Sequence, residues 1–478
     1  MRPSFVQAQH AEHTLPGRNG QAPLISDGSV CYSRGAMAAP GYSDWTQALF
    51  DPATIFAKPE ALRGVRVIDL GTIFLGPTTT TYLAEYGAEV IKVEIPGVGD
   101  TIRALGPSFH WNMSLIGLSE PRNKYFVGLD VRTPKGADLF RRLVAKADVL
   151  VENFRAGTLD RWGIGYRQLS EVNPRLIYSA HNGFGQWGAY GEGRPSYDAI
   201  AQGESGMAAI TGFPTRPPLK SGGYVGDYLG AIVGAATILA ALHHRQRTGQ
   251  GQFIEIAQVE ALIRALDWTW IYHGLTGQHR GRYGNADPAI VPSDIVEAAD
   301  GSIALSAPTD EAFGGLARAM GSPELAEDPR YRTQLARAQE PNRDQLLDLI
   351  QAWAKSRPSA ELVGLGDRHG FAAAPVASGK DHCQDPHLAA RRALWRHDDP
   401  TYGNFPLYGP AAKLSATPGR IKWVIKPVGA DNDFIFRSLL GLSRGELSEL
   451  ETEGIIGRWA DRPGQKPPDN WHGEGSAL

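Results

Sequence analysis

A single carboxylate, Asp227, stands directly before the most apolar run of the chain. The residues from Leu229 to Leu242 are nearly all apolar or small, so we expect a helix buried inside the protein with Asp227 in its first turn. That turn has N–H groups without intrahelical partners and the positive end of the helix dipole. Both favour an anionic, nucleophilic Asp227 near neutral pH. An N-cap without chemistry would explain the same residue.

Strands and helices alternate on both sides of that helix. Apolar and β-branched runs predict strands at 65–70, 89–94, 126–130, 149–152, 176–180 and 253–257, and helices at 78–86 and 134–146. This alternation predicts an α/β fold whose large, Rossmann-like domain has a mostly parallel, doubly wound sheet. Ligands of such sheets bind beyond the carboxyl ends of the strands.

Changes of pattern along the chain predict its domains. A stretch that mixes Gly, Pro, Ser and Ala predicts an N-terminal arm over 1–60. The large domain is expected over 61–265, a linker over 266–285 and a smaller α+β domain over 286–385. The last segment, 386–478, is broken by Pro and Gly and is expected to return to the large domain.

Composition restricts the chemistry further. The 478 residues have a formal net charge of -3 and no long basic block, so a nucleic-acid partner is not expected. The first residues lack an apolar signal core and the longest apolar stretch is short for a bilayer span, so we expect a cytoplasmic protein. Cys31 and Cys383 lie far apart, and Asp381-His382-Cys383 with His387 lacks a distant second pair of ligands; no metal site is predicted.

Several motifs occur in an order that carries a family resemblance. They are Gly71-Thr72-Ile73-Phe74-Leu75-Gly76-Pro77, Gly87-Ala88-Glu89-Val90-Ile91-Lys92-Val93-Glu94, Val151-Glu152-Asn153-Phe154-Arg155, Tyr197-Asp198, Gly226-Asp227 and Arg247-Thr248-Gly249. From about Leu62 to about Lys413 the chain resembles the class III CoA-transferase family, also called the CaiB/BaiF family. The resemblance implies an acyl-CoA enzyme that takes a coenzyme A thioester as substrate and holds no permanent cofactor. It also implies an interlocked, ring-like homodimer.

The family's nucleophilic aspartate falls on Asp227. The resemblance implies that this carboxylate attacks the acyl-CoA carbonyl and gives a mixed anhydride, which CoA converts to an aspartyl-CoA thioester. An acceptor acid then attacks that thioester, so two exchanges between activated derivatives replace one direct attack by a weak nucleophile. Backbone N–H groups at Gly222-Gly223 or near Gly281 to Gly284 are candidates for holding the oxyanions.

Family positions around the CoA adenine and phosphates fall on Asn153, Phe154 and Arg161. Arg103 and Lys124 are further cationic candidates for the phosphates. Each has a structural alternative. Asn153 could end a strand and Phe154 could be core, while Arg161 could form a surface ion pair.

Candidates for binding the acyl group are Phe74, Tyr197, Asp198 and Trp268. Phe74 stands where similar formyl-CoA transferases have a glutamine, Ile95 where they have an arginine, and their tetraglycine loop is missing, so an oxalate-like substrate is not expected. The aromatic residues could instead form a pocket for an aromatic or bulky acid if they converge; they are Phe74, Phe109, Trp111, Trp268, Trp270 and Tyr272. Core packing and a small dicarboxylate donor such as a succinyl group remain open.

Three other functions stay open, and one of them is a hydrolase or a CoA lyase on the same scaffold, because the sequence does not separate water from a carboxylic acid as the final acceptor. α-Methylacyl-CoA racemases in the family pair the same aspartate with a histidine, at a position where this chain has Tyr197. Tyrosine, with a pKa of about 10, exchanges protons poorly at neutral pH, which favours transfer, although His181 is a possible substitute base. The third alternative is a non-catalytic acyl-CoA-binding subunit of a heteromeric transferase, against which the retained Asp227 counts.

Overall fold

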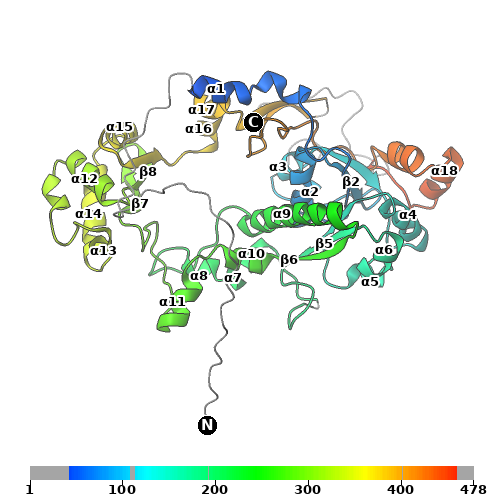
Figure 1. Cartoon of the computed structure of the whole chain (residues 1–478), viewed down its shortest axis with the longest axis horizontal. Coiled ribbons are helices and arrows are strands. Elements are labelled where there is room, and N and C mark those ends of the chain that lie inside the picture. Colours follow the sequence, from blue (N-terminus) through cyan, green and yellow to red (C-terminus); the bar gives the residue numbers. More distant parts are fainter. Residues whose placement is uncertain (1–41, 108–112, 192, 401, 460–478) are drawn as a thin grey trace, which may run out of the picture. The chain divides into compact units, whose positions relative to one another are not determined.

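The computed structural model describes residues 42–107, 113–191, 193–400 and 402–459 (Figure 1). The chain divides into two compact units, Met1–Asp51 and Pro52–Leu478. In the first unit the described part contains helix α1 (Tyr42–Leu49), which has no buried residues. Most of the predicted arm, residues 1–41, lies outside the described residues. Everything below concerns the second unit.

Six parallel strands form the central sheet, in the order β3-β2-β1-β4-β5-β6. They are β1 (Arg66–Asp69), β2 (Glu89–Glu94), β3 (Lys124–Gly128), β4 (Val149–Glu152), β5 (Ile177–Asn182) and β6 (Gln252–Ala257). The strand order reverses direction between β1 and β4, as in dinucleotide-binding folds. The predicted Rossmann-like parallel sheet is confirmed.

Both faces of this sheet are covered. Val67 of β1 belongs to an apolar cluster with residues of α2 (Leu75–Glu85) and α9 (Val225–Thr248). Ile68, its neighbour, belongs to a second cluster with residues of α4 (Pro134–Val144). Successive side chains of a strand point to opposite faces, so one strand feeds both clusters. The shorter helices of this part are α3 (Leu115–Ser119), α5 (Thr158–Arg161), α6 (Tyr166–Val172), α7 (Asp198–Glu204), α8 (Met207–Ile210), α10 (Gln258–Arg264) and α11 (Thr269–Thr276).

A second core lies in the segment predicted as the smaller α+β domain. Its antiparallel sheet has the order β7-β8-β9, with β7 (Ser293–Ala298), β8 (Gly301–Ser306) and β9 (Ala372–Pro375). Helices α12 (Asp310–Ala319), α13 (Gln334–Arg337), α14 (Asn342–Ala354) and α15 (Ser359–His369) follow or precede these strands. Side chains such as Ile303 and Phe313 form its apolar cluster.

The C-terminal segment packs against β3. It contains α16 (Gly379–Gln384), α17 (Pro386–Ala390), the hairpin of β10 (Leu394–Asp399) and β11 (Gly403–Tyr408), a π-helix (Asp433–Leu439) and α18 (Arg444–Thr452). The indole Nε1 of Trp423 donates to the Lys124 carbonyl at 2.7 Å, and the Phe126 N–H donates to Asp431 at 2.8 Å. Ile55, in the short helix Pro52–Ala57, belongs to an apolar cluster that also contains Phe126 of β3 and residues of the C-terminal segment. Residues 52–57 therefore pack with this unit, although the predicted arm included them.

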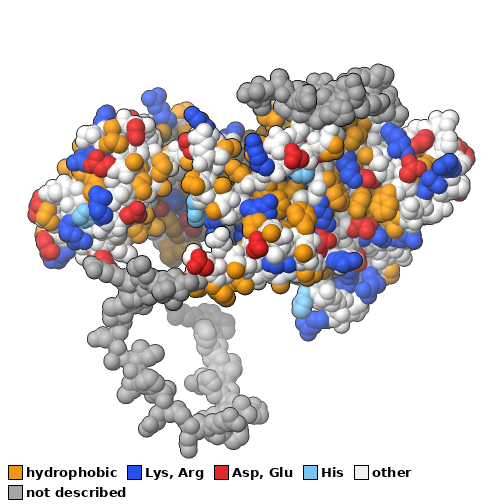
Figure 2. Space-filling model, turned by 90° about the horizontal axis from the view of Figure 1, so that it is seen from above, with side chains coloured by type: hydrophobic (Ala, Val, Ile, Leu, Met, Phe, Trp, Pro, Cys, Tyr) orange, Lys and Arg blue, Asp and Glu red, His pale blue; other side chains and the backbone are white. Residues whose placement is uncertain are grey.

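Charged side chains of both signs are mixed on one face of the molecule (Figure 2). Figure 2 shows Lys and Arg side chains interspersed with Asp and Glu over the described residues of the face that it draws. Ion pairs between neighbouring exposed residues, such as Lys135–Glu453 at 2.6 Å, contribute to this pattern. Such a face offers no extended basic stripe of the kind that binds a phosphate backbone.

Helix α9 lies against α2, β5 and β6 (Figure 1), and a row of glycines allows this close approach. Gly226, Gly230 and Gly234 are spaced by four residues and so lie on one face of the helix. A Cβ atom at Gly230 would come within 2.6 Å of Leu75 Cδ1, and one at Gly234 within 2.3 Å of His181 Cε1. The apolar character of this run was predicted from the sequence, but the close packing at its row of glycines was not.

The opposite side of α9 is not covered by the residues that the structure describes. Ile232 is 50% exposed and Leu239 is 44% exposed, so the predicted fully buried helix is wrong on this side. Helix α9 has 24 residues, more than the apolar run that the sequence analysis considered, and by length and composition alone it could cross a membrane. Its contacts with α2, β5 and β6 mark it as a core helix of the fold.

Replacing Gly234 by alanine is expected to destabilise the fold by about 1–3 kcal/mol, because overpacking forces buried neighbours to shift. The neighbour is His181, which is fully buried and has no room to move. Chemical denaturation measures the loss. Gly274→Ala in α11 is the matched control, since nothing lies within 4 Å of its added Cβ. Equal unfolding midpoints for the two variants would show that Gly234 is not needed for the close packing of α9 against His181.

Candidate active site

A pocket of about 690 Å³ lies where the strand order reverses. The segment Thr72–Leu75 follows β1 and the segment Asn153–Ala156 follows β4, and both line the pocket. In open parallel sheets, ligands bind in the crevice that forms where strand order reverses, because the two loops diverge there. The start of α9 contributes Tyr224 and Asp227 to the wall.

Asp227 is the third residue of α9, and another carboxylate caps that helix. Oδ1 of Asp198 accepts the N–H of Gly226 at 2.8 Å and that of Asp227 at 3.4 Å. Gln202 donates to the other Asp198 oxygen at 2.6 Å. The Asp227 side chain itself accepts a hydrogen bond from Gln258 Nε2 at 2.8 Å. The N-cap alternative for Asp227 is therefore wrong, and its carboxylate lines the pocket instead.

The pKa of Asp227 is raised to about 7. Burial is the main cause, the negative charge of Asp198 adds to it, and the hydrogen bond from Gln258 acts in the opposite direction. The helix start predicted an anionic Asp227 near neutral pH, but burial and the charge of Asp198 raise its pKa into the neutral range. Asp198 stands 29 residues before Asp227 in the sequence, so only the fold brings the two carboxylates together.

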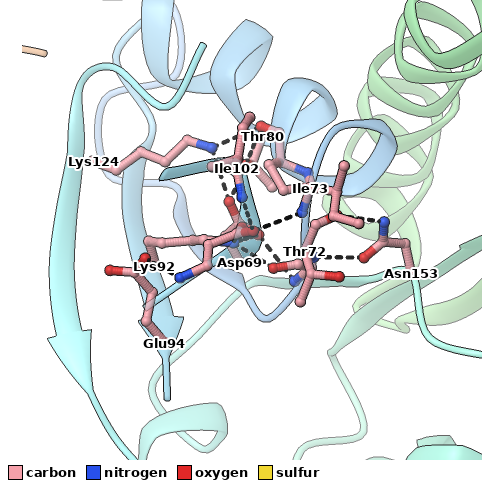
Figure 3. A network of polar contacts seen from close by, with 12 residues as sticks. Asp69, Thr72, Ile73, Thr80, Lys92, Glu94, Ile102, Lys124 and Asn153 are labelled. Atoms are coloured by element: carbon pink, nitrogen blue, oxygen red, sulfur yellow. Dashed lines mark hydrogen bonds and ion pairs between the residues drawn. The ribbon is translucent and has the colours of Figure 1, made fainter. Parts of the chain in front are cut away.

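Buried charges lie beneath the loop that follows β1 (Figure 3). Lys124 Nζ is 2.8 Å from one Asp69 oxygen, and Lys92 Nζ is 3.5 Å from the other and 2.8 Å from Asp100. None of the four side chains is more than 2% exposed. The predicted contact of Lys124 with CoA phosphates has no support in this geometry, because its ammonium group is enclosed and already paired.

This network holds the pocket loop in an uncommon conformation (Figure 3). Asp100 accepts the N–H of Ile73 at 2.8 Å, and the Asn153 amide bonds both the N–H and the carbonyl of Thr72 at 2.6 and 2.8 Å. Ile73 has φ of 64°, in the left-handed region that β-branched residues rarely adopt. Asn153, predicted to contact CoA, therefore lines the pocket and also ties the two loops together.

Three further predicted binding residues lie outside the pocket wall. Arg103 is 4% exposed and pairs with both carboxylate oxygens of Glu94 at 2.8 Å. Arg161 donates to the Thr158 hydroxyl at 2.9 Å, and Trp268 lies beneath the Arg280 guanidinium, 4.3 Å from it. The partners of Arg103 and Trp268 lie within the chain, so neither side chain is placed to contact a ligand in this pocket.

The aromatic residues converge only in part. The Phe74 ring lines the pocket between Tyr224 and Tyr228, at centroid distances of 5.1 and 5.0 Å. Phe154 and Tyr197 also line it. Trp270 and Tyr272 do not, and Phe109 and Trp111 lie outside the described residues.

His181 is completely buried and does not line the pocket. Burial lowers its pKa to about 3, so it stays neutral over the range in which most proteins are folded. Its Nε2 is 2.8 Å from the Ser179 hydroxyl. The role of substitute base that the sequence left open is therefore contradicted.

The structure also places the residues considered for oxyanion and metal binding. The glycines proposed for oxyanion binding, Gly222, Gly223 and the segment 281–284, are not among the described residues of the wall. Asp381 closes a capping box with Ser378 at the start of α16. Among the residues that the structure describes, no group of three His, Cys, Asp or Glu side chains is placed to hold a metal ion.

Several pocket residues were missed from the sequence. Gln258 follows β6 directly, and Arg155 follows Phe154. Arg194 and Lys220 also line the pocket. A polar residue at the carboxyl end of a parallel strand was the available signal for Gln258 and Arg155.

Residues 62–432 match the model of CoA-transferase family III. The chain belongs to this family. A family III CoA-transferase is an enzyme that acts on CoA thioesters, which agrees with a pocket at the carboxyl edge of the sheet and with the resemblance seen in the motifs.

Curated relatives cover most of this family III CoA-transferase. The succinyl-CoA–D-citramalate CoA-transferase of Chloroflexus aurantiacus is 40% identical over 399 residues, which are 83% of this chain and 98% of that protein. The succinyl-CoA:mesaconate CoA-transferase of Haloarcula hispanica is 38% identical over 348 residues, or 71% of this chain and 86% of that protein. A CaiB/BaiF family protein from Brucella suis has a similar structure, with a TM-score of 0.71, 32% identity, and coverage of 80% of this chain and 100% of that one.

Proposed function

We propose that this enzyme moves CoA from succinyl-CoA to a small carboxylic acid by covalent catalysis at Asp227. The observation that carries the proposal is the position of this carboxylate. It lines the pocket at the start of α9, while Asp198 supplies the cap that the helix needs. The names of the relatives, which act on succinyl-CoA with citramalate or mesaconate, support the donor and an acceptor of similar size.

The exchange runs through two derivatives of Asp227. A carboxylate oxygen attacks the thioester carbon of the donor, and the CoA thiolate leaves, which gives a mixed anhydride. The thiolate then attacks the aspartyl carbon, forms aspartyl-CoA and releases the donor acid. The acceptor carboxylate attacks aspartyl-CoA and expels the thiolate, which finally attacks the acceptor's acyl carbon and frees Asp227. Every bond broken is replaced, and no proton has to be added or removed.

The surroundings of Asp227 suit this chemistry. Partial burial raises the pKa of Asp227 to about 7, so its ionised form is more basic than an ordinary aspartate. A more basic carboxylate is a stronger nucleophile towards the thioester. Limited access of water also protects an anhydride from hydrolysis.

Binding of the substrates is assigned to the wall of the same pocket. We assign the CoA moiety to Phe154, Arg155 and the loop at Asn153, which line the pocket. Arg161, which lies outside the wall, is assigned to the CoA phosphates on the family resemblance alone. Phe74 and Tyr197 are assigned to the acyl group, and Asp198 to positioning α9. An aromatic acceptor is less well supported than a dicarboxylic one, because Trp268, Trp270 and Tyr272 do not reach the wall.

The alternatives fit these contacts less well. Racemisation needs a second acid or base beside the α-carbon; His181 is buried away from the pocket and Tyr197 replaces the family's histidine.

A homodimer and a cytoplasmic location are part of the proposal. The exposed apolar side of α9, with Ile232 and Leu239, supports an assembly of at least two copies.

Mass spectrometry of the protein with succinyl-CoA and hydroxylamine tests the proposal. Hydroxylamine attacks anhydrides and thioesters, so a hydroxamate is expected on Asp227 in the native chain and at no site in Asp227→Asn. Exchange of the α-proton into deuterated water without an adduct would favour racemisation. Neither signal, with tight binding of the thioester, would indicate a binding subunit.

Two substitutions are expected to move the pH dependence in opposite directions. The ionised Asp227 is the reactive form, so kcat/KM should rise with pH and level off above a pKa of about 7. Asp198→Asn removes a negative charge and should move this midpoint to lower pH. Gln258→Leu removes a hydrogen-bond donor to the carboxylate and should move it to higher pH. A profile that is flat across neutrality, or two shifts in the same direction, would contradict the assignment.

A further inference from the structure

The charged side chains that line the pocket differ in whether they already have partners of opposite charge within the chain. Of the described lining residues, the charged ones are Asp198, Asp227, Arg155, Arg194 and Lys220. Asp198 is occupied by the start of α9, and Asp227 is the proposed nucleophile. The three cations therefore decide which negative groups of a substrate can be held, and where.

Arg194 already has partners within the chain. Its guanidinium lies over the rings of Phe184 and Tyr190, at 4.6 and 4.3 Å, and one nitrogen is 3.3 Å from a Glu204 oxygen. Stacking and an ion pair both reduce the gain from a further carboxylate. Arg155 stands in the loop after β4, beside Phe154, where the CoA moiety is assigned.

Lys220 differs from both arginines. Its Nζ donates to the neutral carbonyl of Ser221 at 3.1 Å, and no ion pair joins it to a carboxylate of the described residues. Its chain segment leads directly into α9. The N–H of Ser221 bonds to Gln202 at 2.8 Å, and Gln202 in turn bonds to Asp198. The hydrogen bonds of Gln202 and Asp198 thus hold the backbone next to Lys220 and the start of α9, which contains Asp227.

We propose that Lys220 binds the far carboxylate of a dicarboxylic acyl group while the thioester carbon faces Asp227. This inference rests on the proposed function and names its substrate class, the small dicarboxylic acids. Donor and acceptor both become anhydrides of Asp227, so one ammonium group serves both acids in turn. An acid without a second carboxylate leaves the ammonium group unpaired and loses a charge-assisted hydrogen bond. The pocket thus selects dicarboxylic over monocarboxylic acids, because only the dicarboxylic acids pair with the ammonium group of Lys220.

The test compares succinyl-CoA with butyryl-CoA, which has a four-carbon chain without the second carboxylate. The rate at which the donor acid, succinate or butyrate, is released as aspartyl-CoA forms is measured in single turnovers at several thioester concentrations, so that no acceptor acid is needed. For Lys220→Met, the preference for succinyl-CoA over butyryl-CoA is expected to fall about 10- to 100-fold, the range for a lost hydrogen bond between charged groups. Lys220→Arg should keep most of the preference.

Lys146→Met is the matched control, because this lysine is exposed just after α4 and does not line the pocket. It should leave the preference unchanged. Equal losses for both thioesters in Lys220→Met would assign Lys220 to the CoA phosphates and overturn the inference. Loss of preference in Arg194→Gln, with no loss in Lys220→Met, would also overturn it. Absence of any Asp227 adduct in the native chain would instead overturn the proposed function itself.

Discussion

Replacing Asp227 by asparagine is expected to lower the rate of CoA transfer by about 10³-fold or more, because an amide cannot form the anhydride or the aspartyl thioester. The shape of the side chain and its contact with Gln258 can be kept by the amide oxygen. Steady-state turnover with succinyl-CoA measures the loss. Asp367→Asn, an exposed carboxylate in α15, is the control and should keep full activity. Residual transfer within tenfold of the native rate would exclude a covalent role.

The same substitution is expected to stabilise the protein above neutral pH. Asp227 has a pKa of about 7 in the folded chain and 3.8 as the ordinary value, so between these values the folded chain binds more protons than the unfolded one. The native chain therefore loses stability as pH rises from about 4 to about 7, and the asparagine variant does not. Because the side chain is only partly buried, we expect a gain of about 1–3 kcal/mol. Thermal unfolding at pH 5 and pH 8 measures it, and a gain that does not grow with pH would contradict the raised pKa.

Replacing Asp69 by asparagine is expected to cost about 3–5 kcal/mol of stability, because two buried ammonium groups lose their shared carboxylate. Lys124 and Lys92 cannot reach water, and their charges hold the pKa of Asp69 below its usual value despite its burial. The loop after β1 should loosen as well, since Asp69 also accepts the Gly71 N–H at 3.0 Å. Urea unfolding measures the loss of stability.

A double substitution separates the charge from the packing. Adding Lys124→Met to Asp69→Asn removes one unpaired ammonium group, so the double variant should be more stable than the sum of its single losses predicts. Lys135→Met breaks the exposed pair with Glu453 and should cost less than about 1 kcal/mol. If Asp69→Asn cost as little as Lys135→Met, the network would not be the element that holds the pocket loop.

The elements of the sheet were predictable because each strand is encoded locally. The predicted runs at 89–94 and 149–152 match β2 and β4 without change, since a buried parallel strand is a continuous apolar segment. Helix α2 begins at Leu75, although a start at Thr78 was predicted. Pro77 fits the first turn of a helix, where its missing N–H is not needed, so it did not mark the boundary.

The candidate site was predictable only where one residue carries the signal. Asp227 was found because it stands before an apolar helix, but its pKa depends on Asp198, which only the fold brings near. Lys124 and Arg103 were read as free cations, because the sequence does not show that Asp69 and Glu94 enclose them. Lys220 gave no sequence signal, since an exposed lysine in a loop is ordinary until a pocket forms beside it.

On the proposed mechanism, the raised pKa of Asp227 would make the reaction rate sensitive to pH near neutrality. Around a value of about 7, small changes in proton concentration alter the reactive fraction more than they would for an ordinary aspartate, whose titration ends far below neutrality. On the proposed mechanism, acidification would slow the exchange by protonating the nucleophile, and this control would need no allosteric site.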